Sequence, residues 1–573
     1  MALHNTEIAE VFDRLATLLE IEGSNPFRIR AYRNAARLIE GHSEQMAALI
    51  EEGRDLSKLP GIGEDLAEKI ATLVETGSLP LLEEVEQRVP RALAELTRIE
   101  GLGPKRVQQL YQELEVRSLD DLAKAVDAGK VHELEGFGAK TEEAIRAGIA
   151  QLEGEEKRMR LADAEEVAEP LAEFLRGVDG VKAATLAGSY RRRKETVGDL
   201  DILVTCKKDS PVMDRFVNHD EVREVVSHGT TRSTVHLRSG LQVDLRVLPA
   251  VSYGAALHYF TGSKAHNIAV RKRAVTRGLK VNEYGVFKGE KRVAGKTEEE
   301  IFKKVGLPFI APELREDRGE IEAAEAGKLP ELVEEDHLRG DLHAHTDATD
   351  GHNSLREMAE AARERGYAYL AITDHSQAVR VAHGMKPDRL LEQMEAIDRL
   401  NEELDGLTLL KGVEVDILED GRLDMPDDVL ARLDLAVAAI HSKFNLAEAK
   451  QTSRVLKAMD NPHFTLFAHP TCRMINERPP IALDLGKVVE GAAERGCFLE
   501  LNAQPARLDL TDTGCMLARE HGVQVALSTD AHSAAQLSNI RFGIGQARRG
   551  WLGPDDVLNS RSLGELRKLL RRR

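Results

Sequence analysis

Cysteine, aromatic residues and long apolar runs are scarce in this chain. Its 573 residues include only 4 Cys and 1 Trp, and aromatic residues make up 4%. The cysteines show no Cys-x-x-Cys spacing, so we expect neither a zinc ribbon nor a disulfide framework. No apolar run reaches the roughly 18 residues that a membrane-spanning helix needs, and the polar, acidic start shows no secretory signal. We therefore expect a cytoplasmic protein with no membrane partner.

An excess of positive charge is missing as well. The formal net charge is −18, which taken alone argues against a nucleic-acid partner. Charge is local, however: basic residues gather at 191–194 and 271–280, whereas 311–337 is strongly acidic. The total therefore does not exclude DNA. The length predicts two to four domains, and the hydrophobic content of 42% is enough for packed cores.

A Gly-Ser turn, a basic loop and a strand with two acids follow one another over 188–204. Side chains alternate along a strand, so Asp199 and Asp201 face the same side. Two such carboxylates repel each other unless a cation lies between them, and a hard dication with oxygen ligands suits this arrangement. One Asp-x-Asp alone would more simply be an exposed strand edge. The turn and the basic loop can bind phosphate, and they favour a site instead.

A third acid, Asp244, lies in another alternating strand at 241–247. It could complete a cluster of three carboxylates. Three carboxylates, two divalent ions and a triphosphate make a phosphoryl-transfer site.

These motifs, together with Tyr259-Phe260-Thr261-Gly262-Ser263 and 282–284, resemble the palm and the nucleotide-selecting segment of family X DNA polymerases, the DNA polymerase beta group. The resemblance implies an α+β nucleotidyltransferase palm. It implies that the catalytic residues Asp199, Asp201 and Asp244 hold Mg²⁺ or Mn²⁺. The implied nucleotide-binding residues are Gly188, Ser189 and Arg192 at the triphosphate, Tyr259, Phe260 and Gly262 at the sugar, and Asn267 and Arg271 at the base pair.

Residues 1–90 have helical periodicity, and a short pattern recurs three times nearby. Its copies lie at 59–63, 99–103 and 134–138, and each has an apolar residue between two glycines. Glycine allows a tight turn, and the amides at the start of the next helix can bind phosphate without recognising bases. The copies resemble helix-hairpin-helix motifs, which implies DNA contacts from Gly61, Gly63, Gly101, Gly103 and Lys105. The third copy has fewer basic neighbours, and a purely structural role stays open for it.

Lys69 matches, by this resemblance, the lysine that some family X enzymes use as a Schiff-base nucleophile on abasic sites. Such a lysine needs a depressed pKa, and nothing in the sequence shows one. Lyase activity is therefore a hypothesis beside the simpler interpretation of Lys69 as a surface lysine.

The region 338–573 is rich in histidine, and short apolar runs within it end in His, Asp or Glu. Alternating strands and helices predict a parallel sheet, open or closed. In a barrel, the carboxyl ends of the strands converge on one rim, so these side chains would meet in one pocket. Imidazole with carboxylate suits zinc, manganese or iron.

The order of these motifs resembles the polymerase-and-histidinol-phosphatase (PHP) domain over about 338–535. The resemblance implies a distorted (β/α)7 barrel with a three-metal cluster of Zn²⁺ or Mn²⁺. The implied ligands are His343, His345, Glu414 and Asp530 for the first metal, Glu414, His441 and His469 for the second, and Asp350, His375 and His532 for the third. Related domains often have glycine where this chain has Cys472, so metal–thiolate contact is a possibility here. Arg473 and Arg507 are candidate phosphate contacts.

The predicted protein is a multidomain α/β enzyme. Its expected parts are a helical DNA-binding domain at 1–90, a polymerase region at 91–310, an acidic linker, extended or loosely helical, at 311–337, and a PHP domain at 338–573. We predict a monomeric DNA-directed DNA polymerase that uses deoxynucleotides to fill short gaps in gapped or primer–template DNA during base excision repair. The PHP domain would add 3′-5′ exonuclease activity, and the family also suggests abasic-site cleavage or 3′-phosphatase activity. The alternatives are a DNA-end-processing nuclease with weak polymerase activity and a nucleotidyltransferase acting on RNA or a small molecule.

Overall fold

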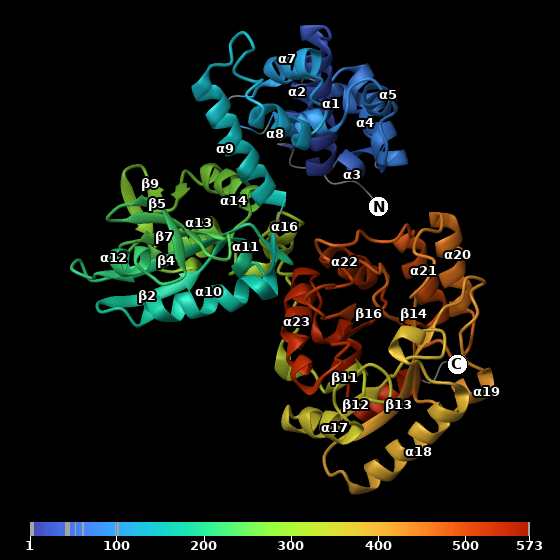
Figure 1. Cartoon of the computed structure of the whole chain (residues 1–573). Coiled ribbons are helices and arrows are strands. Elements are labelled where there is room, and N and C mark those ends of the chain that lie inside the picture. Colours follow the sequence, from blue (N-terminus) through green and yellow to red (C-terminus); the bar gives the residue numbers. More distant parts are fainter. Residues whose placement is uncertain are drawn as a thin grey trace. The chain divides into compact units, whose positions relative to one another are not determined.

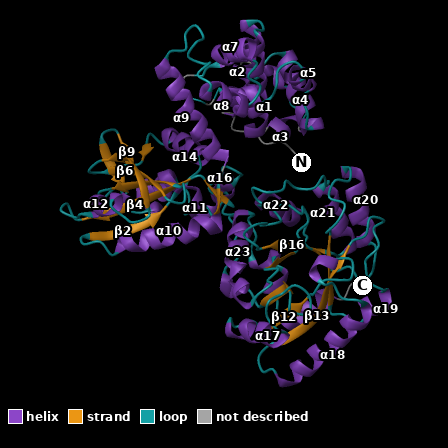
Figure 2. Ribbon diagram, in the orientation of Figure 1, coloured by secondary structure: helices purple, strands orange, loops and turns teal. Residues whose placement is uncertain are grey.

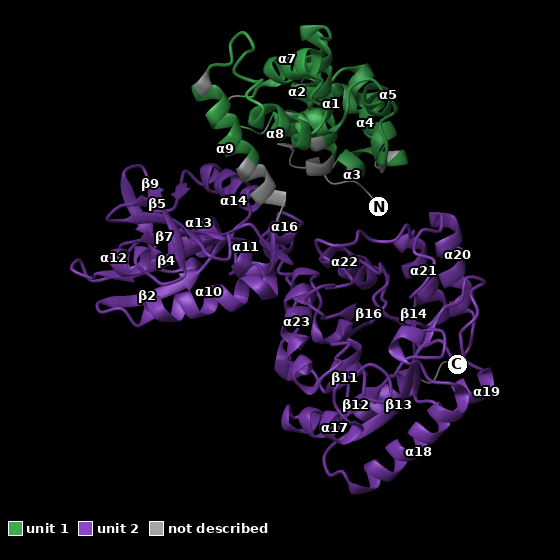
Figure 3. Ribbon diagram, viewed as in Figure 1, with its two compact units in different colours: residues 1–157 green, residues 158–573 purple. Residues whose placement is uncertain are grey.

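The computed structural model describes residues 5–40, 46–51, 53–59, 62–97, 99, 102–156 and 158–570. The chain forms two compact units, residues 1–157 and 158–573, each of which is considered by itself (Figure 3). None of the described helices is long and apolar enough to cross a membrane.

The first unit is helical in its described part (Figures 1 and 2). Its α-helices are α1 (Asn5–Glu22), α2 (Pro26–Glu40), α3 (Met46–Glu51), α4 (Glu64–Thr76), α5 (Pro80–Glu86), α6 (Ala92–Leu96), α7 (Pro104–Leu114), α8 (Leu119–Asp127) and α9 (Ala139–Glu156). One continuous apolar core joins them, with Phe12, Ile70 and Leu110 fully buried. The helices thus bury their apolar faces against one another, as the helical periodicity predicts.

The described residues of the three glycine-containing turns share two structural features. Their central apolar residues, Ile62, Leu102 and Phe137, are all buried in the core. Each backbone N–H donates to the carbonyl three residues earlier, at 3.0, 2.9 and 3.0 Å respectively. A helix follows directly in each case. The repeat in the sequence is therefore a repeat in structure, including its third copy.

The second unit begins with a five-stranded mixed sheet. Its strands, in spatial order, are β2 (Val181–Leu186), β4 (Asp199–Cys206), β7 (Gln242–Val247), β6 (Arg232–Leu237) and β5 (Val222–His228). Only β4 and β7 are parallel neighbours. Helices α10 (Leu161–Arg176) and α12 (Val212–Val217) bury the Leu200 and Ile202 side of β4, whereas α13 (Tyr253–Thr261) packs on the side of Leu203. Because side chains alternate, Asp199 and Asp201 share the face of α13.

Smaller elements complete this region. They are β1 (Met159–Arg160), α11 (Gly188–Arg191), β3 (Thr196–Val197), α14 (Lys264–Thr276), β8 (Lys280–Asn282), β9 (Gly285–Lys288), β10 (Lys291–Ala294) and α15 (Glu298–Val305).

A seven-stranded parallel sheet forms the rest of the unit (Figure 2). Its strands lie in chain order: β11 (Gly340–Ala344), β12 (Tyr369–Ile372), β13 (Thr408–Asp416), β14 (Leu435–Ala439), β15 (Leu466–Phe467), β16 (Phe498–Asn502) and β17 (Val525–Ser528). A parallel bridge between Ala344 and Ala531 joins the two ends, so the barrel is nearly closed. The α-helices of this part are α17 (Leu355–Glu364), α18 (Pro387–Glu403), α19 (Asp427–Leu430), α20 (Glu448–Met459), α21 (Leu485–Arg495), α22 (Asp512–Glu520), α23 (Ile540–Arg549) and α24 (Leu563–Leu570).

The acidic segment 311–337 differs from the extended or loosely helical linker that its composition predicts. It holds the α-helix α16 (Glu320–Glu325) and buries Ile321, Val333 and the whole side chain of Arg315. Several of its acids pair with distant bases; Glu313, for example, binds Arg548 at 2.8 Å. Composition misleads here because the pairing bases lie far away in the sequence.

Candidate active sites

The three palm carboxylates converge at the junction of β4 and β7. Asp201 lies directly opposite Asp244 in the parallel register. Thr234 donates a 2.5 Å hydrogen bond to Asp244 Oδ1, and Arg232 donates one of 2.9 Å to its Oδ2. Burial, reinforced by Asp199 and Asp244, raises the pKa of Asp201 to about 7. The three acids therefore crowd one another as they would around a cation.

The Gly-Ser turn approaches these acids closely. Gly188 has φ +63°, the left-handed region that favours glycine. A Cβ atom there would lie 3.2 Å from Asp201 Oδ2. A larger residue would thus narrow the space between the turn and the carboxylates.

The basic loop of the palm, residues 191–194, is bonded to the end of α13. Arg192 donates to the carbonyl oxygen of Thr261 at 2.8 Å and binds Glu316 at 2.9 Å. Arg191 forms two bonds with Glu298, of 3.0 and 2.7 Å. The structure therefore places the predicted triphosphate residues beside the predicted nucleotide-selecting segment.

Within that segment, the predicted base-pair residue Asn267 braces the backbone. Its amide donates to the carbonyl oxygens of Tyr259 and Gly262 at 2.7 and 3.1 Å. Arg271 in turn donates to the carbonyl oxygen of Asn267 at 3.2 Å. Phe260 lies under the guanidinium of Arg246, 4.5 Å from its ring centre, so the segment also contacts the strand that carries Asp244.

The predicted metal ligands of the barrel meet near the carboxyl ends of its strands. His345 Nε2 lies 3.1 Å from Asp530 Oδ1 and 3.2 Å from His343 Nε2. Both imidazole nitrogens lie 3.6 Å from Glu414 Oε2. The four side chains expected to hold the first metal thus present their donor atoms to one small volume.

Glu414 connects this group to the second one. Its Oε1 lies 3.2 Å from His441 Nε2 and 3.0 Å from His469 Nε2. The carboxylate therefore faces both groups of ligands, as a bridging ligand would.

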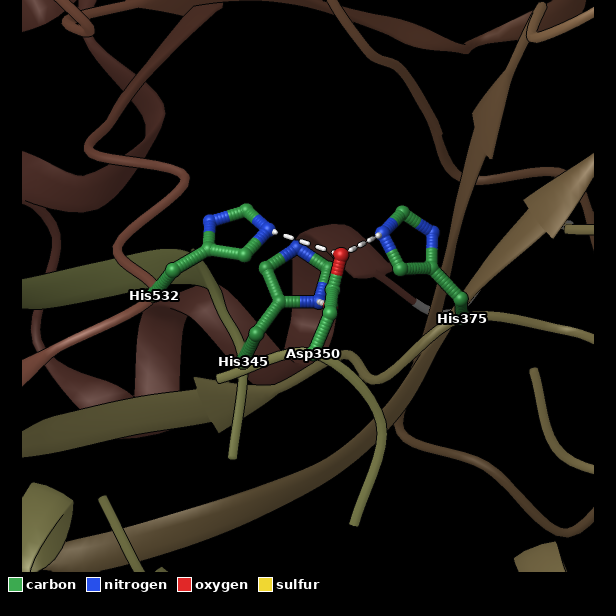
Figure 4. Close-up of side chains that lie close together, drawn as sticks. All are labelled: His345, Asp350, His375 and His532. Atoms are coloured by element: carbon green, nitrogen blue, oxygen red, sulfur yellow. Dashed lines mark ion pairs between the residues drawn. The ribbon is translucent and has the colours of Figure 1, made fainter. Parts of the chain in front are cut away.

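The third group surrounds Asp350 (Figure 4). Asp350 Oδ2 lies 3.4 Å from His375 Nε2 and 3.4 Å from His532 Nε2. The His345 ring stacks between the other two imidazoles, with ring centres 4.5 Å from His375 and 4.3 Å from His532. Glu414 also approaches this group, because its Oε2 lies 2.7 Å from His375 Nδ1.

The donor chemistry of this cluster fits divalent metal ions. Buried atoms without a hydrogen-bond partner include His345 Nδ1, Asp350 Oδ1 and Glu414 Oε2. Burial alone would lower the pKa of His375, but Glu414 and Asp350 raise it to about 10. The cluster therefore favours positive charge at its centre, and imidazole with carboxylate suits zinc, manganese or iron.

A cavity of about 210 Å³ opens onto the cluster. Its lining includes Glu414, His441 and Arg507. Arg507 Nε lies 4.0 Å from Asp530 Oδ2, so this predicted phosphate contact is at the site. Arg473, the other predicted phosphate contact, lies away from the cavity. It is buried and binds Glu195 of the palm. Its guanidinium faces the palm and does not line the cavity, so the structure does not place it with the predicted phosphate contacts.

Cys472 is buried, and its Sγ donates to the carbonyl oxygen of Ile440 at 3.5 Å. Burial raises the pKa of its thiol to about 12, and the potential metal-binding groups among the described residues contain no cysteine. Its φ of +52° lies in the left-handed region, which explains why related domains often have glycine there.

Comparison with known proteins identifies separate family matches for the helical region, the palm region and the barrel. Family models match a helix-hairpin-helix domain at 3–79, a SAM-like helix-hairpin-helix tandem at 93–151, a DNA polymerase beta palm at 158–244, a DNA polymerase beta thumb at 256–316 and a PHP domain at 341–471. The Bacillus subtilis protein named DNA polymerase/3′-5′ exonuclease PolX is 38% identical over 575 residues, which cover 100% of each chain. This chain belongs to the family X DNA polymerases with a C-terminal PHP domain.

Two further relatives match a smaller part of the chain. A probable phosphatase of Thermoanaerobacter sp. (strain X514) is 28% identical over 244 residues, 40% of this chain and 94% of that protein. A probable phosphatase of Acetivibrio thermocellus is 34% identical over 219 residues, 36% of this chain and 83% of that protein. The full-length relative and the family models together confirm the predicted family and fold class.

The predicted DNA-binding residues of this family X chain lie in the first unit. Gly63 and Gly103 are the N-caps of α4 and α7, and Lys105 is exposed in the first turn of α7. Gly61 and Gly101 lie outside the described residues. The lyase candidate Lys69 forms an ion pair with Asp65, so its amine is already engaged.

Three carboxylates of the family X barrel support its histidines and were not assigned a role from the sequence. Glu500 Oε1 lies 2.7 Å from His343 Nδ1, and its Oε2 accepts the N–H of His469 at 2.7 Å. Asp416 lies 3.2 Å from His441 Nδ1, and Asp341 accepts the N–H of His343 at 3.1 Å. Glu500 and Asp416 thus fix the ring orientations of His343 and His441, whereas Asp341 binds the backbone of His343. An acid inside the otherwise apolar stretch 498–501 is the signal that could have revealed Glu500.

Proposed function

We propose that this family X chain is a DNA-directed DNA polymerase that fills short gaps, with a 3′-5′ exonuclease site in its barrel. The main support for polymerase activity is that three carboxylates converge at the β4–β7 junction, beside a Gly-Ser turn and Arg192. A full-length relative named as both polymerase and exonuclease supports the same pair of activities. Gapped or primer–template DNA and deoxynucleotides are the proposed substrates.

In the palm, Asp199, Asp201 and Asp244 would hold Mg²⁺ or Mn²⁺. Bound ions of this kind neutralise the negative charge that gathers on a transferring phosphoryl group. Thr234 and Arg232 hold the carboxylate of Asp244 in place. Arg192 and the Gly188 turn would receive the triphosphate, while Tyr259, Phe260 and Gly262 would limit the space at the sugar.

In the barrel, the nine clustered side chains would hold up to three ions of zinc or manganese. Bound divalent ions lower the pKa of a coordinated water to about 7. Glu500 and Asp416 keep His343 and His441 oriented toward the centre. Arg507 lines the cavity and would attract the phosphate of a DNA end.

Narrower activities of the barrel need DNA that carries a 3′ phosphate or an abasic site as substrate. The matches to probable phosphatases favour 3′-phosphatase activity as a second candidate function. Abasic-site cleavage is a further candidate, since it hydrolyses a phosphodiester, as exonuclease activity does. Lyase activity at Lys69 stays a hypothesis, against which the ion pair with Asp65 counts.

The decisive test uses one labelled DNA with a one-nucleotide gap and a 5′ phosphate. The full chain is incubated with Mn²⁺, with and without deoxynucleotides, beside the variants Asp244→Ala and Glu414→Ala. We expect extension with nucleotides and 3′ shortening without them. Asp244→Ala should lose only extension, and Glu414→Ala only shortening. Loss of both activities in either folded variant would contradict the assignment of two sites.

A further inference from the structure

Arg549, the last residue of α23 in the barrel region, reaches the nucleotide-binding loop of the palm. Its guanidinium is buried, with the side chain only 2% exposed. One nitrogen donates to the carbonyl oxygen of Arg192 at 3.0 Å and binds Glu316 Oε1 at 2.8 Å. The other terminal nitrogen binds Asp512 Oδ2 at 2.6 Å. A side chain of the barrel region is thus built into the polymerase loop.

Glu316 lies between two arginines. Its Oε1 accepts from Arg192 Nε at 2.9 Å and from Arg549 Nη1 at 2.8 Å. Burial would raise the pKa of Glu316, but Arg192 and Arg549 hold it below its usual range. The carboxylate is therefore charged, and the two guanidinium groups share it.

This sharing affects the availability of Arg192. A carboxylate bonded to a guanidinium competes with any phosphate for the same donors. If Glu316 had Arg192 as its only partner, turning Arg192 toward a nucleotide would leave a buried charge unpaired, which is strongly unfavourable. Because Arg549 binds the same oxygen, Glu316 keeps a partner when Arg192 moves.

We propose that Arg549 is a positioning residue of the polymerase site, which keeps Glu316 paired and so frees Arg192 for the triphosphate of the incoming deoxynucleotide. The inference rests on the proposed role of Arg192. The barrel region then contributes to nucleotide binding through a residue that does not touch the nucleotide, and this contribution is independent of hydrolysis in the barrel.

The first test measures single-nucleotide incorporation on gapped DNA with full-length Arg549→Gln. We expect the KM for deoxynucleotide to rise about tenfold, with kcat changed less than threefold and 3′-5′ shortening unchanged. Asp512 still has Arg318 at 2.9 Å, so the variant leaves it paired. Arg549→Lys keeps the charge and should stay within about threefold of the wild-type KM.

The matched control is Arg548→Gln. Arg548 is the preceding residue of the same helix, and it binds Glu313 of the same acidic segment. Its replacement removes the same charge from nearly the same place without touching Glu316 or Arg192. Its KM should therefore stay within about twofold of wild type. A rise equal to that of Arg549→Gln would overturn the proposal, since general charge loss would then explain it.

The second test adds Glu316→Gln. Removing the competing carboxylate should return the KM of Arg549→Gln to within about threefold of wild type, and should lower KM much less in the wild-type background. Such non-additivity is what direct coupling produces. An unchanged KM in Arg549→Gln, or a raised KM that Glu316→Gln does not correct, overturns the proposal. If Arg549→Gln does not fold, Glu316→Gln alone decides: its KM should fall, and an increase overturns the proposal.

Arg192→Gln separates this inference from the proposed function on which it rests. A large rise of KM in Arg192→Gln, with none in Arg549→Gln, overturns only the role of Arg549. An unchanged KM in Arg192→Gln overturns the assignment of Arg192 to the triphosphate and the inference together.

Discussion

Arg473 of the barrel and Glu195 of the palm form a two-point ion pair, with Nη2–Oε2 and Nη1–Oε1 distances of 2.6 and 3.1 Å. Arg473 lies four residues after the predicted metal ligand His469, and Glu195 directly follows the basic loop of the palm. The two residues are 278 positions apart in the chain. Together with Arg549, this pair ties the polymerase loop to the barrel inside one compact unit.

We expect Arg473→Gln to destabilise the second unit. The guanidinium is 9% exposed and the carboxylate 32% exposed, so solvent weakens the pair only in part. A double-mutant cycle with Glu195→Gln, followed by urea unfolding, should give a coupling free energy of roughly 1 kcal/mol. Arg541→Gln is the matched control, because its own pair with Glu165 is independent of Glu195. A coupling near zero would show that the pair does not hold palm and barrel together.

Replacing the glycines at the starts of α4 and α7 should affect DNA binding more than stability. Gly63 and Gly103 have φ values of −88° and −79°, and a Cβ atom at either would meet nothing within 4 Å. Neither backbone conformation nor internal packing requires glycine there, although glycine is a favoured N-cap residue. We predict that DNA approaches the backbone closely at both turns. Gly63→Ala and Gly103→Ala should change the free energy of unfolding by only about 0.5 kcal/mol. They should nevertheless weaken binding to gapped DNA several-fold, as measured by fluorescence anisotropy.

Gly136 is the contrasting control in the third turn. Its φ is +84°, so alanine there is strained and should lower stability by about 1 kcal/mol. If Gly63→Ala and Gly103→Ala bind DNA as tightly as wild type, the first two turns are structural and do not contact the backbone of DNA.

Much of this molecule could be predicted because its chemistry is local in the sequence. Asp199 and Asp201 are two residues apart on one strand, and His343 and His345 are as well, so alternation alone puts each pair on one face. The strand ends of a parallel barrel bring the other ligands together without any knowledge of packing. The fold class and the ligand cluster therefore follow from short motifs and their order.

Interactions between distant segments could not be predicted in the same way. Glu316 and Arg549 are 233 positions apart, and nothing around either residue identifies its partner. For the same reason the composition of 311–337 predicts an acidic linker, although this segment packs against the rest of the second unit. Arg473 shows the opposite error: its place near a metal ligand suggested a phosphate contact, but its side chain points to the palm.

Glu500→Gln should weaken metal binding in the barrel. The carboxylate is fully buried and binds His343 Nδ1 at 2.7 Å, which fixes the ring so that Nε2 faces the ligand cluster. Loss of such a partner typically lowers metal affinity by about 10- to 100-fold. The measurement is a Mn²⁺ or Zn²⁺ titration of chelator-treated protein by calorimetry. Glu490→Gln, on the exposed face of α21, should bind as wild type. Equal affinity in Glu500→Gln would show that the histidine is oriented by other contacts.

The second unit should also carry a pH-dependent stability term at Glu320, which is fully buried. Burial raises the pKa of its carboxyl to about 7, against the N–H groups of Asp317 and Arg318 that donate to it. His266 Nδ1 lies 2.6 Å away, and burial with Arg315 lowers the pKa of that ring to about 3. The imidazole is therefore neutral at ordinary pH and does not compensate an ionised Glu320.

The sign of the effect follows from the raised pKa. The folded state favours the protonated carboxyl, so this contribution is fully present below about pH 4 and is lost as pH rises through 7. Glu320→Gln removes the ionisation; its amide can donate to Nδ1 of neutral His266, at the loss of the hydrogen bond from the N–H of Asp317. The free energy of unfolding, measured by urea titration, should rise for the variant relative to wild type between pH 5 and pH 8, by up to about 3 kcal/mol. The exposed neighbour Glu322 serves as control, since Glu322→Gln should differ from wild type by the same amount at both pH values. If the difference in unfolding free energy between Glu320→Gln and wild type is the same at pH 5 and pH 8, the hydrogen bonds from residues 317 and 318 keep the carboxylate ionised at both pH values.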